Sequence, residues 1–230
     1  MKSNKIYEVY KLLYKTYGPQ GWWPFINYTS KYHPSDYTFP RDKNELFEVC
    51  LGSILTQNTT FNSVVKSLQN LNDLGCLNSE AIKNMDIDIL KKTIKPSGYF
   101  NQKARYILEF IKFYDNLNGK IPSREELLKV IGIGEETADS ILLYGYNQCE
   151  FKIDAYTKRL FLELGIINEK DKYKDAKYLV ELELGKVMED KEELRIVYQE
   201  FHALIVCHCK DYYSKKPYGV GCFLKQRIVK

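Results

Sequence analysis

The sequence of 230 residues has no hydrophobic run long enough to cross a membrane. Its first residues contain neither the apolar core nor the small-residue cleavage site of a secretory signal. Its six cysteines are scattered, and such cysteines in a chain without a signal are normally reduced thiols. These absences predict an intracellular protein of the cytoplasm or nucleoid that does not bind a membrane. We expect the protein to be a monomer.

The sequence also has little excess charge of either sign. Lys and Arg number 34 against 30 Asp and Glu, which gives a net charge of +4. The excess is concentrated after residue 205, where the basic residues are Lys210, Lys215, Lys216, Lys225, Arg227 and Lys230. A basic tail suits a polyanionic partner, although a solvated surface explains it equally well.

Strand-type alternation of polar and apolar residues is not sustained anywhere, although residues 150–153 could be briefly extended. Apolar residues recur instead at helical spacing within 107–114 and 194–205. Further helices are predicted at 44–56, 60–72, 123–130, 135–147, 154–164 and 173–189. The fold class predicted from these patterns is all-α.

The most specific pattern in the chain is the junction between two predicted helices. A helix predicted over 123–130 stops, Gly132-Ile133-Gly134 forms a turn, and an amphipathic helix starts at once. Two glycines one residue apart permit positive φ and leave room for a partner at the backbone. The N–H groups that open the second helix could bind a phosphate, but a plain helical hairpin has the same pattern.

An aspartate follows this hairpin. Asp154 lies twenty residues after Gly134 and opens another amphipathic helix, so an N-cap role is expected. The hairpin and Asp154 together resemble the helix-hairpin-helix DNA glycosylases of the endonuclease III superfamily, in which a catalytic aspartate follows such a hairpin at about this distance. The resemblance implies that Asp154 is catalytic and that Gly132 and Gly134 contact DNA.

Further segments extend the resemblance over residues 18–230. Residues 45–59 look like the family's early helix and its Thr-Gln-Asn loop, whose glutamine fills the gap left by an extruded base. Gln57 takes that role by resemblance, with Asn58 beside it. Residues 96–104 are similar to the family's segment that leads into the helix before the hairpin.

Two segments match a narrower branch that includes bacterial 3-methyladenine DNA glycosylases of the endonuclease III type. These segments are Gly18–Pro24, which contains two tryptophans, and Gln199–Val206. By analogy with this branch, Trp22, Trp23 and Phe61 are expected to form the base pocket. Glu136 is included in the pocket because its carboxylate could hydrogen-bond a neutral base.

The resemblance also implies a domain organisation. It predicts a two-lobed helical fold with the active-site cleft between the lobes. Residues 42–150 would form a six-helix lobe that carries the hairpin, and residues 1–41 with 151–230 would form the second lobe.

The sequence departs from the family at the position of the lysine that bifunctional members use to form a Schiff base. Counting from the hairpin, that position is Glu136. Because a carboxylate cannot form an imine, the resemblance predicts a monofunctional hydrolase without lyase activity by that route. The alternative role of Glu136 is an acid in the first turn, favoured by the helix dipole.

A second departure concerns the four-cysteine iron–sulfur cluster of many relatives. The corresponding positions here are Tyr212, Gly219, Cys222 and Ile228, so a cluster is predicted to be absent. Cys207 and Cys209, with Cys222, do not have the usual zinc spacing, and no metal site is expected. In relatives a monovalent cation binds hairpin carbonyls, and the same site is conceivable here.

The implied function is a glycosylase that flips a damaged, N-alkylated base out of double-stranded DNA and removes it hydrolytically. Two alternatives remain at this point. The enzyme could act on oxidised or mismatched bases, or the chain could be a non-catalytic helix-hairpin-helix protein that binds distorted DNA.

Overall fold

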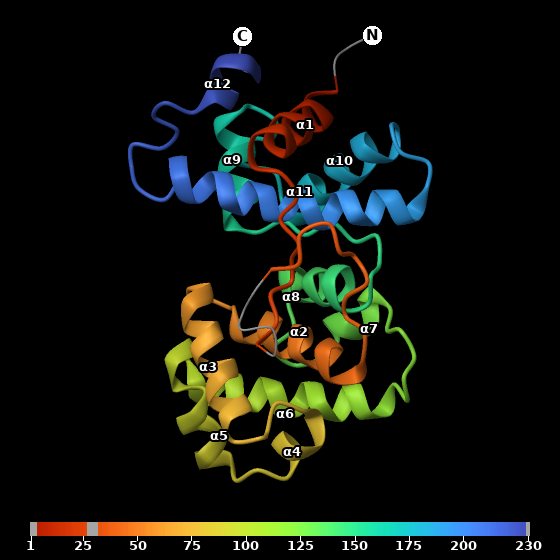
Figure 1. The fold of residues 1–230 in the computed structure, drawn as a ribbon, viewed down its shortest axis with the longest axis vertical. Helices are drawn as coiled ribbons and strands as arrows, with labels where there is room; N and C mark the ends of the chain where they lie inside the picture. The colour runs from red at the N-terminus through yellow and green to blue at the C-terminus, as the bar shows by residue number, and fades with distance from the viewer. Residues whose placement is uncertain (1–3, 27–31, 229–230) are drawn as a thin grey trace. The chain divides into compact units, whose positions relative to one another are not determined.

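A computed structural model describes residues 4–26 and 32–228, and every element within these ranges is a helix (Figure 1). The all-α prediction is confirmed for these residues. The chain forms two compact units: unit 1 contains Met1–Trp22, His33–Tyr37 and Gln148–Lys230, and unit 2 contains Trp23–Tyr32 and Thr38–Asn147. No helix in the described ranges has the length and apolar character that crossing a membrane requires.

Unit 2 is built from short and medium helices, drawn from orange to green in Figure 1. They are α2 (Lys43–Leu55), α3 (Phe61–Asp73), α4 (Ser79–Lys83), α5 (Ile87–Thr93), the 3₁₀ turn η2 (Lys95–Ser97), α6 (Phe100–Asn116), α7 (Arg124–Leu128), α8 (Glu135–Ser140) and the π-helical turn η3 (Ile141–Gly145). The sequence did not predict α4 and α5, because helices of five and seven residues contain too few positions to show periodicity. Side-chain caps start both: Asn78 accepts the N–H of Ala81, and Asp86 accepts that of Asp88.

The core of unit 2 forms around α2 and α6. Its members include the buried side chains of Phe47, Ile54, Leu68, Ile107 and Phe110. Fully burying such a side chain contributes about 1.5–3 kcal/mol, so this core rather than helix propensity holds the short helices in place.

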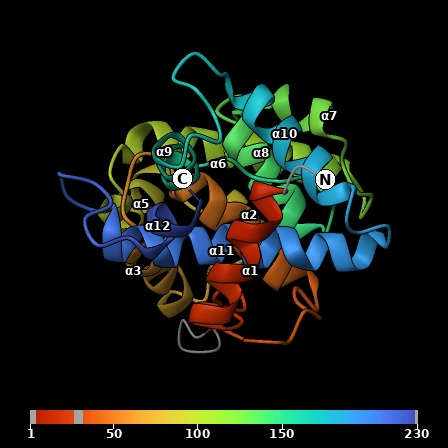
Figure 2. The same cartoon turned by 90° about the horizontal axis from the view of Figure 1, so that it is seen from above.

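Unit 1 contains five helices within the described ranges. They are α1 (Lys5–Tyr17), α9 (Ala155–Glu163), α10 (Tyr173–Gly185), α11 (Lys191–Tyr212) and α12 (Phe223–Ile228). In Figure 2, α1 lies across α11, and the Tyr10 ring meets the Phe201 ring edge-on at a centroid distance of 5.7 Å. The sequence did not predict α1 or the six-residue α12.

A buried lysine ties three elements of unit 2 together. Lys103, on α6, is 2% exposed, and its Nζ donates to the carbonyls of Leu55 and Ser97 at 2.7 Å each. Leu55 ends α2 and Ser97 ends η2, so the ammonium satisfies carbonyls that these helix ends leave without intrahelical partners. Burial lowers the pKa of Lys103 to about 8.

This pKa predicts a specific pH dependence of stability. The unfolded chain keeps the Lys103 proton up to about pH 10.5, whereas the folded chain releases it above about pH 8. The unfolded state therefore binds more protons across this window, and the folded state gains stability as the pH rises. We expect the unfolding free energy of the wild type, relative to Lys103→Met, to increase from pH 8 to pH 10 in denaturant titrations.

Lys112→Met is the matched control, because this lysine lies on the same helix with its side chain 67% exposed and paired with Glu109. The difference between the wild type and Lys112→Met should stay flat over the same range. A flat difference for Lys103→Met would contradict the burial of an ammonium at this position.

Candidate active site

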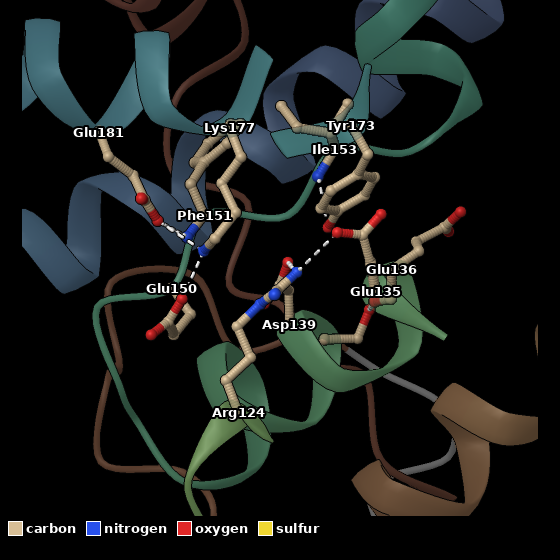
Figure 3. Close-up of polar contacts among 11 residues, drawn as sticks. Arg124, Glu135, Glu136, Asp139, Glu150, Phe151, Ile153, Tyr173, Lys177 and Glu181 are labelled. Carbon is tan, nitrogen blue, oxygen red and sulfur yellow. Dashed lines mark hydrogen bonds and ion pairs between the residues drawn. The ribbon is translucent and has the colours of Figure 1, made fainter. Parts of the chain in front are cut away.

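An extended segment before α9 is held in place by α10. The N–H of Phe151 donates to Glu181 Oε1 at 2.8 Å, and the N–H of Ile153 donates to the Tyr173 hydroxyl at 3.2 Å (Figure 3). Lys177 binds Glu181 at 2.6 Å and also pairs with Glu150. Alternate N–H groups thus reach side chains of one helix, which fixes the backbone that leads into Asp154.

Asp154 is the N-cap of α9, as the sequence predicted. Its Oδ1 accepts the N–H of Thr157 at 2.7 Å and the Thr157 hydroxyl at 2.9 Å. Its Oδ2 lies 3.2 Å from Nε2 of His202, on α11. The side chain is 12% exposed. Both carboxylate oxygens are therefore held, and a small part of the group still reaches solvent.

The surroundings of Asp154 favour its ionised form. Burial alone would raise the pKa of Asp154, but His202, the positive charge of Lys152 and the N–H of Thr157 outweigh it. Together they hold this pKa well below its usual range. The group is a carboxylate at neutral pH, so it can stabilise a cation or orient water but cannot act as a general acid.

The segment that precedes Trp22 is bound to α11. Glu200, which is 1% exposed, accepts the N–H of Gln20 at 2.7 Å and the N–H of Gly21 at 3.0 Å. Gly21 has φ of +63°, and a Cβ there would lie 2.2 Å from the backbone of His33. The half-buried Trp22 then meets the His202 ring edge-on, at a centroid distance of 5.6 Å.

Trp23 belongs to unit 2, although the sequence analysis placed it with the N-terminal arm of the other lobe. It is 3% exposed, and its ring meets Phe61 at 5.6 Å and Tyr144 at 5.8 Å. A Cβ at Gly52 would lie 2.8 Å from Trp23, so the glycine makes room for the indole. Trp23 and the half-buried Phe61 are thus together, whereas Trp22 groups with His202 and Asp154 in unit 1.

The two glycines of the hairpin differ. Gly132 has φ of +90°, and a Cβ there would lie 2.1 Å from the ring of Tyr106, so conformation and packing both require glycine. Gly134 is the N-cap of α8 with φ of −94°, and a Cβ there would meet nothing within 4 Å. The expected positive φ is therefore found at Gly132 and not at Gly134. At Gly134 neither the backbone conformation nor the packing requires glycine.

The loop after α2 is tied to this hairpin. Gln57 Nε2 donates to the carbonyl of Gly132 at 2.8 Å and to the Thr137 hydroxyl at 3.1 Å. Asn58, the next residue, is exposed in the left-handed region with φ of +50°. In this conformation the Gln57 side chain stabilises the hairpin, and Asn58 is more exposed to solvent than Gln57.

The start of α8 is acidic and carries no lysine. Glu135 and Glu136 are exposed in its first turn, and Arg124 reaches Glu135 at 3.5 Å (Figure 3). Arg124 also binds the fully buried Asp139 through Nε, at 2.7 Å, which fastens α7 to α8. Glu136 is therefore an exposed carboxylate in the first turn of α8, and its place in a base pocket stays a prediction.

The residues at the cluster positions do not fit a four-cysteine iron–sulfur site. The only thiol among them, Cys222, is buried, and its Sγ lies 3.2 Å from both His208 Nε2 and the Tyr213 hydroxyl. Ile228 adds an apolar side chain that is 7% exposed. Within residues 4–26 and 32–228 no three His, Cys, Asp or Glu side chains gather in a way that could hold a metal ion.

The sequence did not single out His202 and Thr157, which bind Asp154, or Glu200, which binds the segment before Trp22. His202 and Glu200 lie within the apolar helical pattern of α11, where buried polar residues are easily read as part of a core stripe. Thr157 could have been found, because an aspartate N-cap commonly binds the N–H three residues later.

Comparisons with known proteins identify relatives of this chain. A Methanocaldococcus jannaschii protein, described provisionally as a DNA repair glycosylase, is 39% identical over 98% of both chains. Endonuclease III of Sulfolobus acidocaldarius is 31% identical, over 83% of this chain and 84% of its own.

Solved structures of DNA glycosylases are also similar to this chain. The H. pylori 3-methyladenine DNA glycosylase bound to 1,N6-ethenoadenine matches with a TM-score of 0.68 and 26% identity, over 90% of this chain and 97% of its own. A trapped endonuclease III–DNA covalent intermediate matches with a TM-score of 0.73 at 20% identity, over 98% and 95% of the two chains, which shows the shared two-lobed fold.

Residues 51–184, which span the hairpin and Asp154, match the HhH-GPD superfamily of base excision DNA repair proteins. This match and the relatives together set aside the non-catalytic alternative. The chain therefore belongs to the HhH-GPD superfamily, and it is a DNA N-glycosylase of base excision repair.

Proposed function

We propose that this enzyme is a monofunctional glycosylase that hydrolytically removes an N-alkylated, 3-methyladenine-like base from duplex DNA. The observation that carries the proposal is the geometry of Asp154, whose two carboxylate oxygens are bound by Thr157 and His202 in surroundings that keep its pKa below the usual range. Departure of the base leaves an oxocarbenium-like sugar, and a fixed negative charge stabilises that cation. The same carboxylate can orient the attacking water.

The charge state of Asp154 also bears on the lesion. A carboxyl group whose pKa lies well below its usual range has no proton to give to a departing base. An N-alkylated purine already carries positive charge and leaves without protonation, whereas a neutral oxidised or mismatched base gains more from an acid. Asp154 therefore suits the alkylated base better.

The aromatic residues support the same substrate. Trp22 is half-buried beside His202, and an indole face attracts a desolvated cationic ring by about 1–2 kcal/mol. Trp23 is packed against Phe61 and Tyr144, so we assign Trp22 the larger role in stacking. The 26% identity with a 3-methyladenine DNA glycosylase over most of both chains points in the same direction.

Contacts with DNA are assigned to the hairpin and the loop after α2. Gly134 is open at its Cα, which lets a phosphate approach the N–H groups at the start of α8. Asn58 is the residue that enters the space left by the flipped base, because Gln57 would first lose two hydrogen bonds to the hairpin. The proposed enzyme has no iron–sulfur cluster, and Glu136 stands where bifunctional members have the lysine that forms the Schiff base.

Base release from defined duplexes tests the assignment. We expect the wild type to release 3-methyladenine faster than an oxidised or a mismatched base, measured by chromatography of free bases. Asp154→Asn keeps a good N-cap, so folding and DNA binding should be retained while release falls by about 100-fold or more. Preferred release of a neutral lesion, or near-normal release by Asp154→Asn, would contradict the proposal.

Borohydride trapping tests the lack of lyase activity. Because Glu136 cannot form an imine, no covalent complex with abasic DNA should appear when the wild type is treated with sodium borohydride. A strand-cleaving endonuclease III treated in parallel is the positive control. A trapped complex formed by the wild type would show that another amine reaches C1′ and that the enzyme is bifunctional.

The two hairpin glycines should respond differently to substitution. Gly132→Ala forces a side chain into the Tyr106 ring at positive φ, so we expect a loss of about 2–4 kcal/mol in unfolding free energy. Gly134→Thr fits the backbone and supplies an N-cap hydroxyl, so stability should hold while affinity for DNA falls. Unchanged DNA affinity of a folded Gly134→Thr would show that no phosphate approaches there.

A further inference from the structure

His202 contacts two groups to which the proposed function gives different tasks. Its Nε2 lies 3.2 Å from Oδ2 of Asp154, and its ring meets Trp22 edge-on at 5.6 Å. We propose that His202 is a positioning residue that holds the carboxylate beneath the sugar and the indole beside the base in one fixed arrangement. This inference rests on the proposed function and adds a residue to it.

The contact with Asp154 supplies what the N-cap cannot. Thr157 binds only Oδ1, through its N–H and its hydroxyl. A carboxylate held through one oxygen can still turn about its Cβ–Cγ bond, because this terminal torsion is broad. A second contact at Oδ2 fixes the plane of the group, and a misplacement of about 1 Å can lower a rate about 100-fold.

The contact with Trp22 completes a support that begins at Glu200. Glu200 binds the N–H groups of Gln20 and Gly21, which fixes the backbone on the N-terminal side of Trp22. The indole itself then rests against His202. Because Glu200 and His202 lie on the same helix, α11 holds both the backbone and the ring of this segment.

His202 is itself placed firmly enough for this task. It is 1% exposed, and its neighbours in α11, Phe201 and Ala203, are fully buried. Its ring therefore lies in packed surroundings and cannot swing into solvent without disturbing the core of unit 1. Because His202 contacts Oδ2 of Asp154, the position of α11 fixes the orientation of the carboxylate.

The chain provides a matched control on the same helix. His208 lies six residues further along α11 and is 0% exposed. Its ring nitrogens lie 3.2 Å from Cys222 Sγ and 3.0 Å from the Tyr17 hydroxyl. Replacing His208 thus removes a buried imidazole with a hydrogen-bond partner at each ring nitrogen, and it removes no contact to Asp154 or Trp22.

The first experiment compares His202→Ala, His202→Gln and His208→Gln in single-turnover release of 3-methyladenine, alongside affinity for abasic DNA. We expect His202→Ala to slow release about 10–100-fold with little change in affinity. His202→Gln keeps a side-chain N–H and should recover much of the rate, while His208→Gln should release the base at the wild-type rate if folded. Equal rates for His202→Ala and His208→Gln would overturn the proposal.

A second readout does not depend on activity. Tryptophan emission should change on His202→Ala in the wild-type background and stay unchanged in a Trp22→Phe background. An unchanged wild-type spectrum would overturn the contact with Trp22. A wild type that releases neither 3-methyladenine nor any other lesion would instead contradict the proposed function, and this inference would fail with it.

Discussion

In the proposed function, the chemistry depends on how one carboxylate, that of Asp154, is held. Thr157 binds one oxygen of Asp154 and His202 binds the other, and the extended segment before it is fixed by Glu181 and Tyr173. Burial by itself would neutralise such a group, so these contacts are what keep it charged. In the proposed function, this N-cap of α9 also supplies the negative charge that the reaction uses.

In the proposed function, the two units contribute different residues to the glycosylase reaction. Unit 1 holds Asp154 with His202 and Trp22, while unit 2 carries the hairpin, the loop with Asn58 and the paired rings of Trp23 and Phe61. Within unit 2, Gln57 binds the Gly132 carbonyl of the hairpin, and Arg124 of α7 binds Asp139 of α8. The acidic start of α8 departs from a lysine-bearing hairpin, and this difference is what separates hydrolysis from imine chemistry in the proposal.

The sequence predicted the helical class, the hairpin and the N-cap role of Asp154, because each follows from local spacing. It did not predict α4, α5 or the role of His202, because a five-residue helix and one polar residue in an apolar stripe carry little local signal. Trp22 and Trp23 are adjacent in sequence yet belong to different units, which only tertiary packing decides. Likewise, Gly132 and Gly134 differ in their tolerance of a side chain, because the Tyr106 ring lies beside Gly132 and not beside Gly134.

The central claim is that Asp154 is ionised and held so by its neighbours. The most direct test is a titration of its carboxyl carbon by NMR, with Asp154→Asn used to assign the signal. We expect the signal not to titrate between pH 7 and the ordinary aspartate pKa of 3.8. A midpoint at or above that value would contradict the claim, because the carboxylate would then lack the stabilisation assigned to His202, Lys152 and Thr157.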